Sequence, residues 1–244
     1  MLPHRMGQAP GRRKPQEPMT MKKIIGRKVG MTQLFDEKGN VTGVTVIEAG
    51  PNYVTQVKTV ENDGYNAIQL GFGEVKAKKL SRGEQGHLGL LKANDKHPKR
   101  RDISGVPAVK HLEEARIKET AYKQGDVIKA DIFAVGEIVD VAGTMKGRGF
   151  AGGIKRHGFH RQKKTHGASD RERAPGSIGS GTTPGRVVKG QRMSGHYGNT
   201  QITSMRAKVL MVDVERNLIA VSGSVPGANG GIVVIKESRK GAKK

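Results

Sequence analysis

The hydrophobic pattern of the first third of the chain is that of short strands. Residues 41–47 read VTGVTVI, rich in β-branched side chains, and the segment DEKGN at 36–40 has the composition of a turn. Further runs at 53–60 and 67–72 follow at regular spacing, with turn residues between them. Several short strands at this spacing predict a β-barrel or sandwich, and residues 21–73 are predicted to form its first part.

The next region, residues 74–136, mixes helical and strand patterns. Residues 82–93 predict a short helix that three glycines weaken, and residues 92–102 form a basic segment typical of a loop. Residues 111–117 and 126–129 predict further strands. We interpret this region as an α+β insertion that returns to the barrel.

Strand character resumes at residues 137–142, and the composition then changes sharply over residues 143–198. This segment holds 14 Gly, 12 Lys or Arg and only two acidic residues, with almost no apolar periodicity. Such a stretch cannot bury enough apolar surface to fold by itself. A loop of this length inside a compact domain indicates either disorder or a partner that orders it.

The last part of the chain returns to β structure. Residues 208–214 and 218–222 flank the tripeptide Glu-Arg-Asn and predict a β-hairpin, and residues 230–236 supply a last strand. Residues 199–237 are therefore predicted to close the barrel.

Both ends of the chain are basic. Residues 238–244 form a short tail, and residues 1–20 contain four Pro beside three Arg and one Lys, which predicts a disordered arm. The predicted fold class is mainly β: a β-barrel with an α+β insertion and a long basic, glycine-rich extension.

The net charge of the chain limits the classes of partner that this extension could bind. The chain has 44 Lys and Arg against 22 Asp and Glu, a formal net charge of +22, and so large an excess calls for a polyanion. No run approaches the roughly 18 apolar residues of a membrane-spanning helix, and no recognition helix is visible for a DNA groove. A long irregular basic strand suits folded RNA better than a regular DNA duplex.

One motif inside the extension invites a nucleotide-binding interpretation. Residues 147–152 read GRGFAG and match the dinucleotide fingerprint, after a predicted strand. The mechanism also needs a helix that starts at the third glycine and a βαβ unit. Residues 153–158 are a poor helix start and no βαβ pattern follows, so we interpret the motif as a flexible strand exit where backbone approaches a partner closely.

The remaining candidate chemistry is weak. The absence of cysteine excludes disulfides and thiolate zinc sites and is compatible with a reducing cytoplasm. Four histidines lie in the extension, but a metal ion would sit among Lys and Arg with few carboxylates, so neither metal nor cofactor is predicted. His166, Ser169 and Asp170 have the residue types of a triad, yet a triad needs a rigid scaffold. The chain is therefore not predicted to be an enzyme.

The basic residues and histidines of the extension are the predicted RNA contacts. Lys and Arg neutralise phosphates and release counterions, while glycines let the backbone pass close to RNA. The predicted contact residues are Lys146, Arg148, Lys155, Arg156, His157, His160, Arg161, Lys163, Lys164, His166, Arg171, Arg173, Arg186, Lys189, Arg192 and His196.

The chain resembles the bacterial ribosomal protein L3 family in a consistent order of motifs between residues 21 and 236. The motifs that carry the resemblance are IGRKVGMTQLF at 25–35, VTVIE at 44–48, VTQVK at 54–58, the segment 147–155, THG at 165–167, PGSIG at 175–179, TPGRV at 183–187, the segment 189–196, VDVERNL at 212–218 and VPGA at 225–228. The arm at 1–20 lies outside the family pattern.

The resemblance implies a translation-protein-type β-barrel whose extension, residues 143–198, runs into 23S rRNA towards the peptidyl-transferase centre. It also implies binding near the 3′ end of that rRNA, an early role in assembly of the large subunit in the cytoplasm, and neighbouring ribosomal proteins as partners. The tip would fall at residues 157–166. Gln162 corresponds to a glutamine that a methyltransferase modifies on the side-chain amide in some relatives. A free RNA chaperone or assembly factor and a nucleotide-dependent enzyme are the alternative interpretations.

Overall fold

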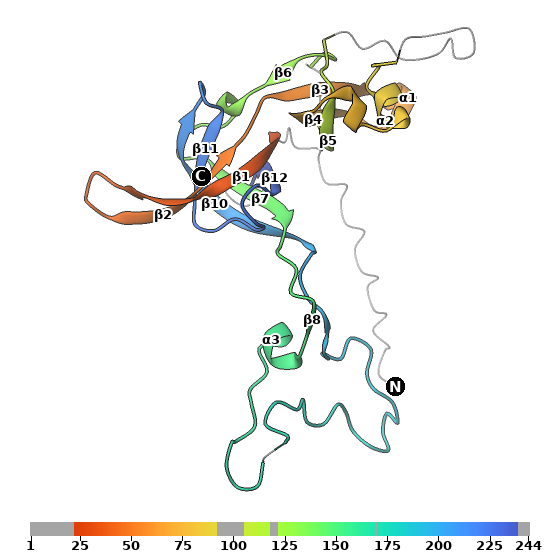
Figure 1. The fold of residues 1–244 in the computed structure, drawn as a ribbon, viewed down its shortest axis with the longest axis vertical. Helices are drawn as coiled ribbons and strands as arrows, with labels where there is room; N and C mark the ends of the chain where they lie inside the picture. The colour runs from red at the N-terminus through yellow and green to blue at the C-terminus, as the bar shows by residue number, and fades with distance from the viewer. Residues whose placement is uncertain (1–21, 92–104, 118–121, 169, 239–244) are drawn as a thin grey trace, which may run out of the picture.

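The computed structural model describes residues 22–91, 105–117, 122–168 and 170–238. A β-barrel and a smaller sheet lie beside each other, and a long segment runs away from the barrel (Figure 1). The predicted arm at 1–20, the predicted basic loop at 92–102 and residues 239–244 of the predicted tail lie outside the described residues.

The barrel is closed and consists of six antiparallel strands. Their order around the barrel is β1 (Lys23–Phe35), β12 (Ile232–Glu237), β7 (Ile138–Thr144), β10 (Gln201–Asp213), β11 (Leu218–Ser222) and β2 (Val41–Glu48). Alternate residues of each strand face inward, such as Ile219 and Val221 on β11 or Val139 and Val141 on β7, which are all fully buried. The prediction of a mainly β barrel protein is confirmed.

The second sheet has four antiparallel strands in the order β5 (Val109–Arg116), β4 (Ala67–Glu74), β3 (Asn52–Lys58) and β6 (Val127–Ile128). The short helices of this part of the chain are α1 (Val60–Asp63), η1 (Ala77–Lys79), α2 (Arg82–His87) and η2 (Ala130–Ile132), the last of which contacts β10 of the barrel. The predicted short helix within 82–93 is confirmed, and Ser81 and Glu84 form a capping box at its start.

The predicted first part of the barrel, residues 21–73, extends too far along the chain. Strands β3 and β4 were expected in the barrel but form the second sheet, so the insertion begins at Asn52 rather than at residue 74. The physical reason is that both edges of β2 are occupied, one by β1 and the other by β11. Because β11 lies far along the chain, the local pattern of β3 cannot reveal that competition.

A continuous hydrophobic core joins the two sheets. Ile24 and Ile25 of β1 belong to the same buried cluster as Leu70 of β4 and Ile128 of β6. A smaller cluster under α2 contains Leu80, Leu88, Val106 and Val109. The barrel and the insertion therefore fold as one body.

The predicted strand at 208–214 is longer than its hydrophobic run. Strand β10 begins at Gln201, because its polar first half pairs with β7, from Gln201 opposite Thr144 onwards. The pairing shifts between Ser204 and Ala207, where Arg206 adopts a positive φ of 61° and its backbone N–H donates to Asp140 at 2.9 Å. Since β7 ends where β10 begins, the segment between them leaves and re-enters the barrel at one place.

Candidate RNA interface

The extension starts as a paired neck, which we define as residues 145–159 and 193–200. The two sides exchange backbone hydrogen bonds, with Arg148 N–H donating to Tyr197 O at 2.8 Å and Tyr197 N–H donating to Gly149 O at 2.9 Å. Strands β8 (Phe150–Ala151) and β9 (Gly195–His196) continue the pairing. The neck is therefore a narrow ribbon that projects from the barrel (Figure 1).

A short helix, α3 (Gly153–His157), packs against the other side of the neck. The Arg156 guanidinium donates to the carbonyl of Met193 at 2.7 Å, and Nε2 of His157 lies 3.0 Å from the same oxygen. The ring of Phe159 lies against Gly153, where an added Cβ would come within 2.7 Å of it. A larger residue there would displace the Phe159 ring, and the contacts of Arg156 and His157 with Met193 hold the helix against the other side of the neck.

This helix corrects the prediction that no helix would follow Gly152. Its five residues start at Gly153, with Gly152 as the N-cap. The βαβ requirement of a dinucleotide site is still unmet, because every strand pair in the described part of the chain is antiparallel. Within GRGFAG, Gly149 instead contributes to the neck, with a positive φ of 62° and a carbonyl that accepts from Tyr197 N–H.

Residues 160–192 form the distal loop, most of which is exposed. Gln162 N–H donates to Glu172 O at 2.9 Å, and the Glu172 carboxylate faces Arg161 at 3.3 Å and Lys164 at 3.9 Å. These two cations are therefore partly neutralised within the loop. An open hollow of about 580 Å³ beside them is lined by Gln162, His166, Asp170 and Arg171, among others.

The predicted contact residues divide between the two parts of the extension. Those on the neck are Lys146, Arg148, Lys155, Arg156, His157 and His196. Those on the distal loop are His160, Arg161, Lys163, Lys164, His166, Arg171, Arg173, Arg186, Lys189 and Arg192. All are exposed except Arg156 and His157, which are half-buried against Met193.

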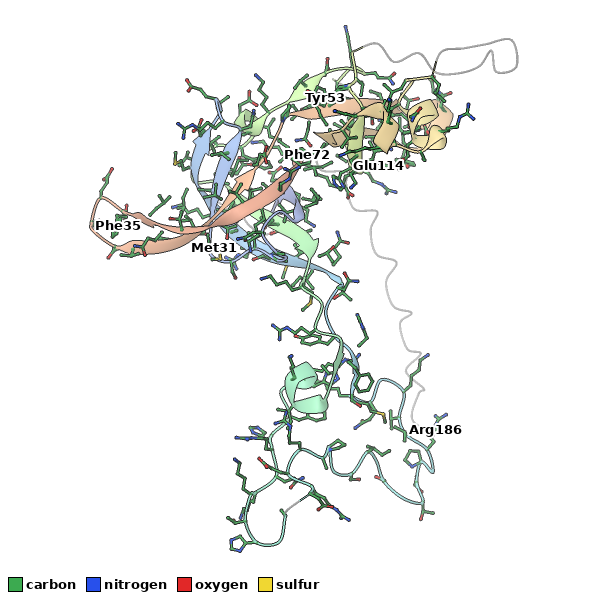
Figure 2. All side chains as sticks on the ribbon, viewed as in Figure 1. Met31, Phe35, Tyr53, Phe72, Glu114 and Arg186 are labelled. Atoms are coloured by element: carbon green, nitrogen blue, oxygen red, sulfur yellow. The ribbon has the colours of Figure 1, made fainter. Side chains whose placement is uncertain are left out.

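The exposed cations spread along the extension rather than converge on one pocket. Figure 2 shows Arg186 on the distal loop, away from the barrel. Over residues 143–198, 12 Lys and Arg face only two acids, and Glu172 already has cationic partners. This geometry suits a polyanion that surrounds the extension, because a small ligand would touch only a few of these side chains.

The aromatic residues of the neck were not among the site residues predicted from the sequence. Phe150, Phe159 and Tyr197 lie in the neck, where the Arg148 guanidinium sits 5.3 Å from the Tyr197 ring and the His157 and Phe159 rings are 5.7 Å apart. Phe150 is 79% exposed and pairs with His196 across the ribbon. The sequence contains a sign of this, because three of the chain's nine aromatic residues lie in the extension and disordered segments contain few aromatic residues.

The weaker candidates gain no support from this geometry. Ser169 of the triad-like group lies outside the described residues, and His166 and Asp170 border an open hollow on an exposed loop. Within the described ranges, no three His, Asp or Glu side chains are grouped in a way that could hold a metal ion. No described helix is long and apolar enough to cross a membrane.

Comparison with known proteins identifies the family. The large ribosomal subunit protein uL3 of Herpetosiphon aurantiacus is 51% identical over 222 residues, which cover 91% of this chain and 98% of that protein. The uL3 proteins of Carboxydothermus hydrogenoformans and Pseudomonas fluorescens are 50% and 48% identical, over 90% and 89% of this chain and 99% and 97% of their own lengths. This chain belongs to the ribosomal protein L3 family.

The family profile described as Ribosomal protein L3 matches residues 102–215, a range that contains the whole neck and the distal loop. The extension is therefore a family feature and not an addition peculiar to this chain. Ribosomal protein L3 is a family of structural ribosomal proteins without catalytic activity. Family membership thus agrees with the prediction that the chain is not an enzyme.

Proposed function

We propose that this protein is a structural constituent of the large ribosomal subunit, held in the cytoplasmic ribosome by an extension that penetrates 23S rRNA. The observation that carries the proposal is the exposed extension itself. It leaves the barrel as a narrow ribbon and presents cations along its whole length, with hardly any carboxylate to balance them.

Each part of the extension has a physical role in this proposal. The neck holds the distal loop away from the barrel, so the loop reaches between RNA helices without the barrel following it. Lys and Arg side chains of the loop neutralise phosphates, and the counterions that they release drive binding. The distal loop has few internal contacts, so its ordering entropy is lost only when RNA surrounds it.

The finer assignments rest on the resemblance to the family. They are binding near the 3′ end of 23S rRNA, an early role in assembly, and an approach of the tip at residues 157–166 to the peptidyl-transferase centre. The exposed tip and its cations support an RNA environment there. Because proteins of this family are structural, the effect of the extension on that centre would come from holding rRNA helices in place.

Deletion of residues 154–164 tests the division of labour between barrel and extension. Within the described structure, residues 154–164 make no hydrogen bond to the barrel, so we expect the barrel of the variant to unfold at the same temperature as that of the full chain. Large-subunit precursors should accumulate in cells that carry only the variant, as sucrose-gradient profiles would show.

The matched control replaces residues 154–164 with a Gly-Ser linker of equal length. If chain length were all that mattered, this variant would restore maturation; if the cations matter, it would not. Normal maturation in both variants would contradict the proposed role of the tip. Unfolding of the barrel in either variant would contradict its independence from the extension.

We also propose that Gln162 is methylated on its side-chain amide. Gln162 is exposed and borders the open hollow of the distal loop, so a methyltransferase could reach it before assembly. The enzyme would transfer a methyl group from its sulfonium donor to the amide nitrogen, which loses a proton. Mass spectrometry of the peptide that contains Gln162 would detect the added methyl group, and an unmodified peptide from mature ribosomes would contradict the proposal.

A further inference from the structure

Strands β1 and β2 continue past the barrel as a free hairpin. We define the distal hairpin as residues 29–43. Strand β1 pairs with β12 only as far as Arg27, and β2 pairs with β11 only from Val44 onwards. Beyond these points β1 and β2 pair with each other, apart from the carbonyl of Gly43, which accepts a hydrogen bond from Gly223 N–H at 2.8 Å, and the hairpin projects from the barrel (Figures 1 and 2).

One face of the distal hairpin exposes three large apolar side chains, with the polar Gln33 between two of them. Met31 and Phe35 lie on the same face of β1, because side chains alternate along a strand, and Phe35 lies directly opposite Val41 of β2. Met31 is 55% exposed, Phe35 68% and Val41 57%. Figure 2 shows Met31 and Phe35 along the projecting hairpin. Grouped apolar side chains on a protruding element are typical of a surface that another molecule covers.

The charge of the distal hairpin is unlike that of the rest of the chain. The chain carries a net charge of +22, but residues 29–43 hold one cation, Lys38, and two acids, Asp36 and Glu37. All three lie at the turn, where Gly39 N–H donates to Asp36 O at 2.8 Å. A surface built to contact phosphates would need Lys or Arg, so this hairpin is unsuited to an RNA backbone.

The outer edge of β1 is also unprotected. No strand in the described part of the chain pairs with residues 29–35 on the side away from β2. Exposed edge strands are usually shielded by charged side chains or proline, and VGMTQLF contains neither. Such an edge favours a protein partner, whose backbone or side chains can cover it.

A glycine in β2 strengthens this assignment. Gly30 and Gly43 lie within the strands, have no positive φ, and have no atom within 4 Å of an added Cβ. Gly30 flanks the irregularity in the pairing of β1 between Lys28 and Gly30, where glycine is common. Neither the fold nor the packing of the chain requires glycine at position 43, although glycine weakens a strand, and close approach of a partner's backbone accounts for it.

We propose that the distal hairpin docks on another protein of the large ribosomal subunit, through an apolar patch that basic residues border on the partner. Met31, Phe35 and Val41 supply the apolar contact. Asp36 and Glu37 face the basic border of the partner. The proposal rests on residence in the large subunit, but not on what the extension binds.

Photo-cross-linking in intact subunits tests the proposal. The full chain is expressed with benzoylphenylalanine in place of Phe35, and large subunits are purified at high salt and irradiated. We expect a cross-link to a single protein that survives nuclease and disappears with protease. Mass spectrometry should place it in an apolar patch of a subunit protein, next to Lys or Arg.

Two control positions separate this proposal from the function of the extension. Benzoylphenylalanine at Val60, which is 59% exposed on α1, should not give the same protein cross-link. At Val188 of the distal loop it should label rRNA. Labelling of rRNA alone from position 35, or no cross-link there, would overturn the docking proposal. If benzoylphenylalanine at Val188 did not label rRNA, the proposed function of the extension would be contradicted. The docking proposal for the distal hairpin would still be tested by the cross-link at position 35.

A serine variant gives a second readout. Met31→Ser combined with Phe35→Ser removes exposed side chains, so the thermal midpoint of the free chain should not change. Subunits that carry this variant should lose the cross-linked neighbour at lower salt than wild-type subunits do. Equal retention of that neighbour would contradict the proposed contact.

Discussion

At the scale of single residues, Asn52 takes the place of a missing strand beside β1. Its side chain is fully buried, accepts a hydrogen bond from Ile25 N–H at 3.0 Å and donates one to Ile25 O at 2.9 Å. Because β2 pairs with β1 only from Arg27 onwards, no backbone partner is available to Ile25 on that side. Asn52 thus joins the barrel to the start of the second sheet.

Replacement of Asn52 by alanine should leave both backbone groups of Ile25 buried and unsatisfied. We expect the free energy of unfolding to fall by about 2–4 kcal/mol, measured by urea denaturation of the full chain. Asn40→Ala is the matched control, since Asn40 is exposed and only its backbone oxygen forms a hydrogen bond, and its effect should stay within about 0.5 kcal/mol. A similar loss in both variants would contradict the bridging role of Asn52.

The Lys58–Glu114 pair gives a pH-dependent contribution to stability. The hydrogen bond from Lys58 Nζ to Glu114, at 2.6 Å, holds the pKa of the carboxyl below its ordinary value of 4.5. The unfolded chain therefore binds this proton more readily, and the contribution is complete above about pH 4.5 and is lost as the pH falls through the folded pKa.

Glu114→Gln should destabilise the protein near neutral pH by a few tenths to about 1 kcal/mol, because the pair is partly exposed. The difference from the wild type, measured by urea denaturation, should narrow below pH 4.5. Glu61→Gln, in the exposed first turn of α1, should change little at any pH. A constant difference for Glu114→Gln down to acidic pH would rule out the linkage.

Sequence patterns alone could not rank the individual cations. Lys28 is 6% exposed, and its ammonium donates to the carbonyl of Val225 at 2.8 Å, so it holds a barrel loop in place. Burial lowers the pKa of Lys28, and the nearby charge of Lys146 adds to the effect. In the net charge Lys28 and Lys146 contribute equally, but only Lys146 is exposed on the extension and available to bind RNA.

At the scale of elements, the neck depends on one close backbone approach. Gly198 has a φ of +84°, and an added Cβ would lie 2.4 Å from Lys146 O and 2.8 Å from Arg148 N. Neither contact can yield without separating the two sides of the ribbon. A side chain at this position therefore opposes the pairing of Arg148 with Tyr197.

Gly198→Ala should open the neck, at a cost of about 1–3 kcal/mol from the left-handed backbone alone. Hydrogen exchange at the amides of Arg148 and Tyr197 should accelerate, while the amides of β11 keep their protection. Gly181→Ala is the matched control, since it has open space and no positive φ, and exchange should not change. Unchanged exchange in Gly198→Ala would show that the ribbon is not paired as described.

The strands were more predictable than their partners. Strand β11 lies at the predicted residues, 218–222, because its β-branched run is complete in itself. Strand β3 belongs to the second sheet because β11 pairs with the edge of β2 that β3 would otherwise occupy. Strands β2 and β11 lie far apart in the sequence, so local patterns do not reveal this pairing. The neck was missed because its pairing involves few apolar residues, and glycine conceals the close contacts that hold it together.

At the scale of the whole molecule, a rigid barrel carries two projections of opposite character. The extension is basic and polar, whereas the distal hairpin is apolar with an acidic turn. We propose that the first binds rRNA and the second a neighbouring protein, so the barrel would connect RNA and protein within the subunit. The composition of the chain reveals the extension, because many positive charges lie in one segment. It does not reveal the distal hairpin, whose few exposed apolar residues do not stand out in the overall composition.

Sedimentation of large subunits through a high-salt gradient tests the proposed rRNA-penetrating extension most directly. A protein held only by six to ten phosphate contacts would lose about 10³–10⁵ in affinity between about 50 and 200 mM salt. An extension enclosed by folded rRNA should instead keep the tagged chain in the large-subunit peak at one copy per subunit. Release of the chain to the top of the gradient would contradict an embedded extension and would indicate a peripheral RNA chaperone.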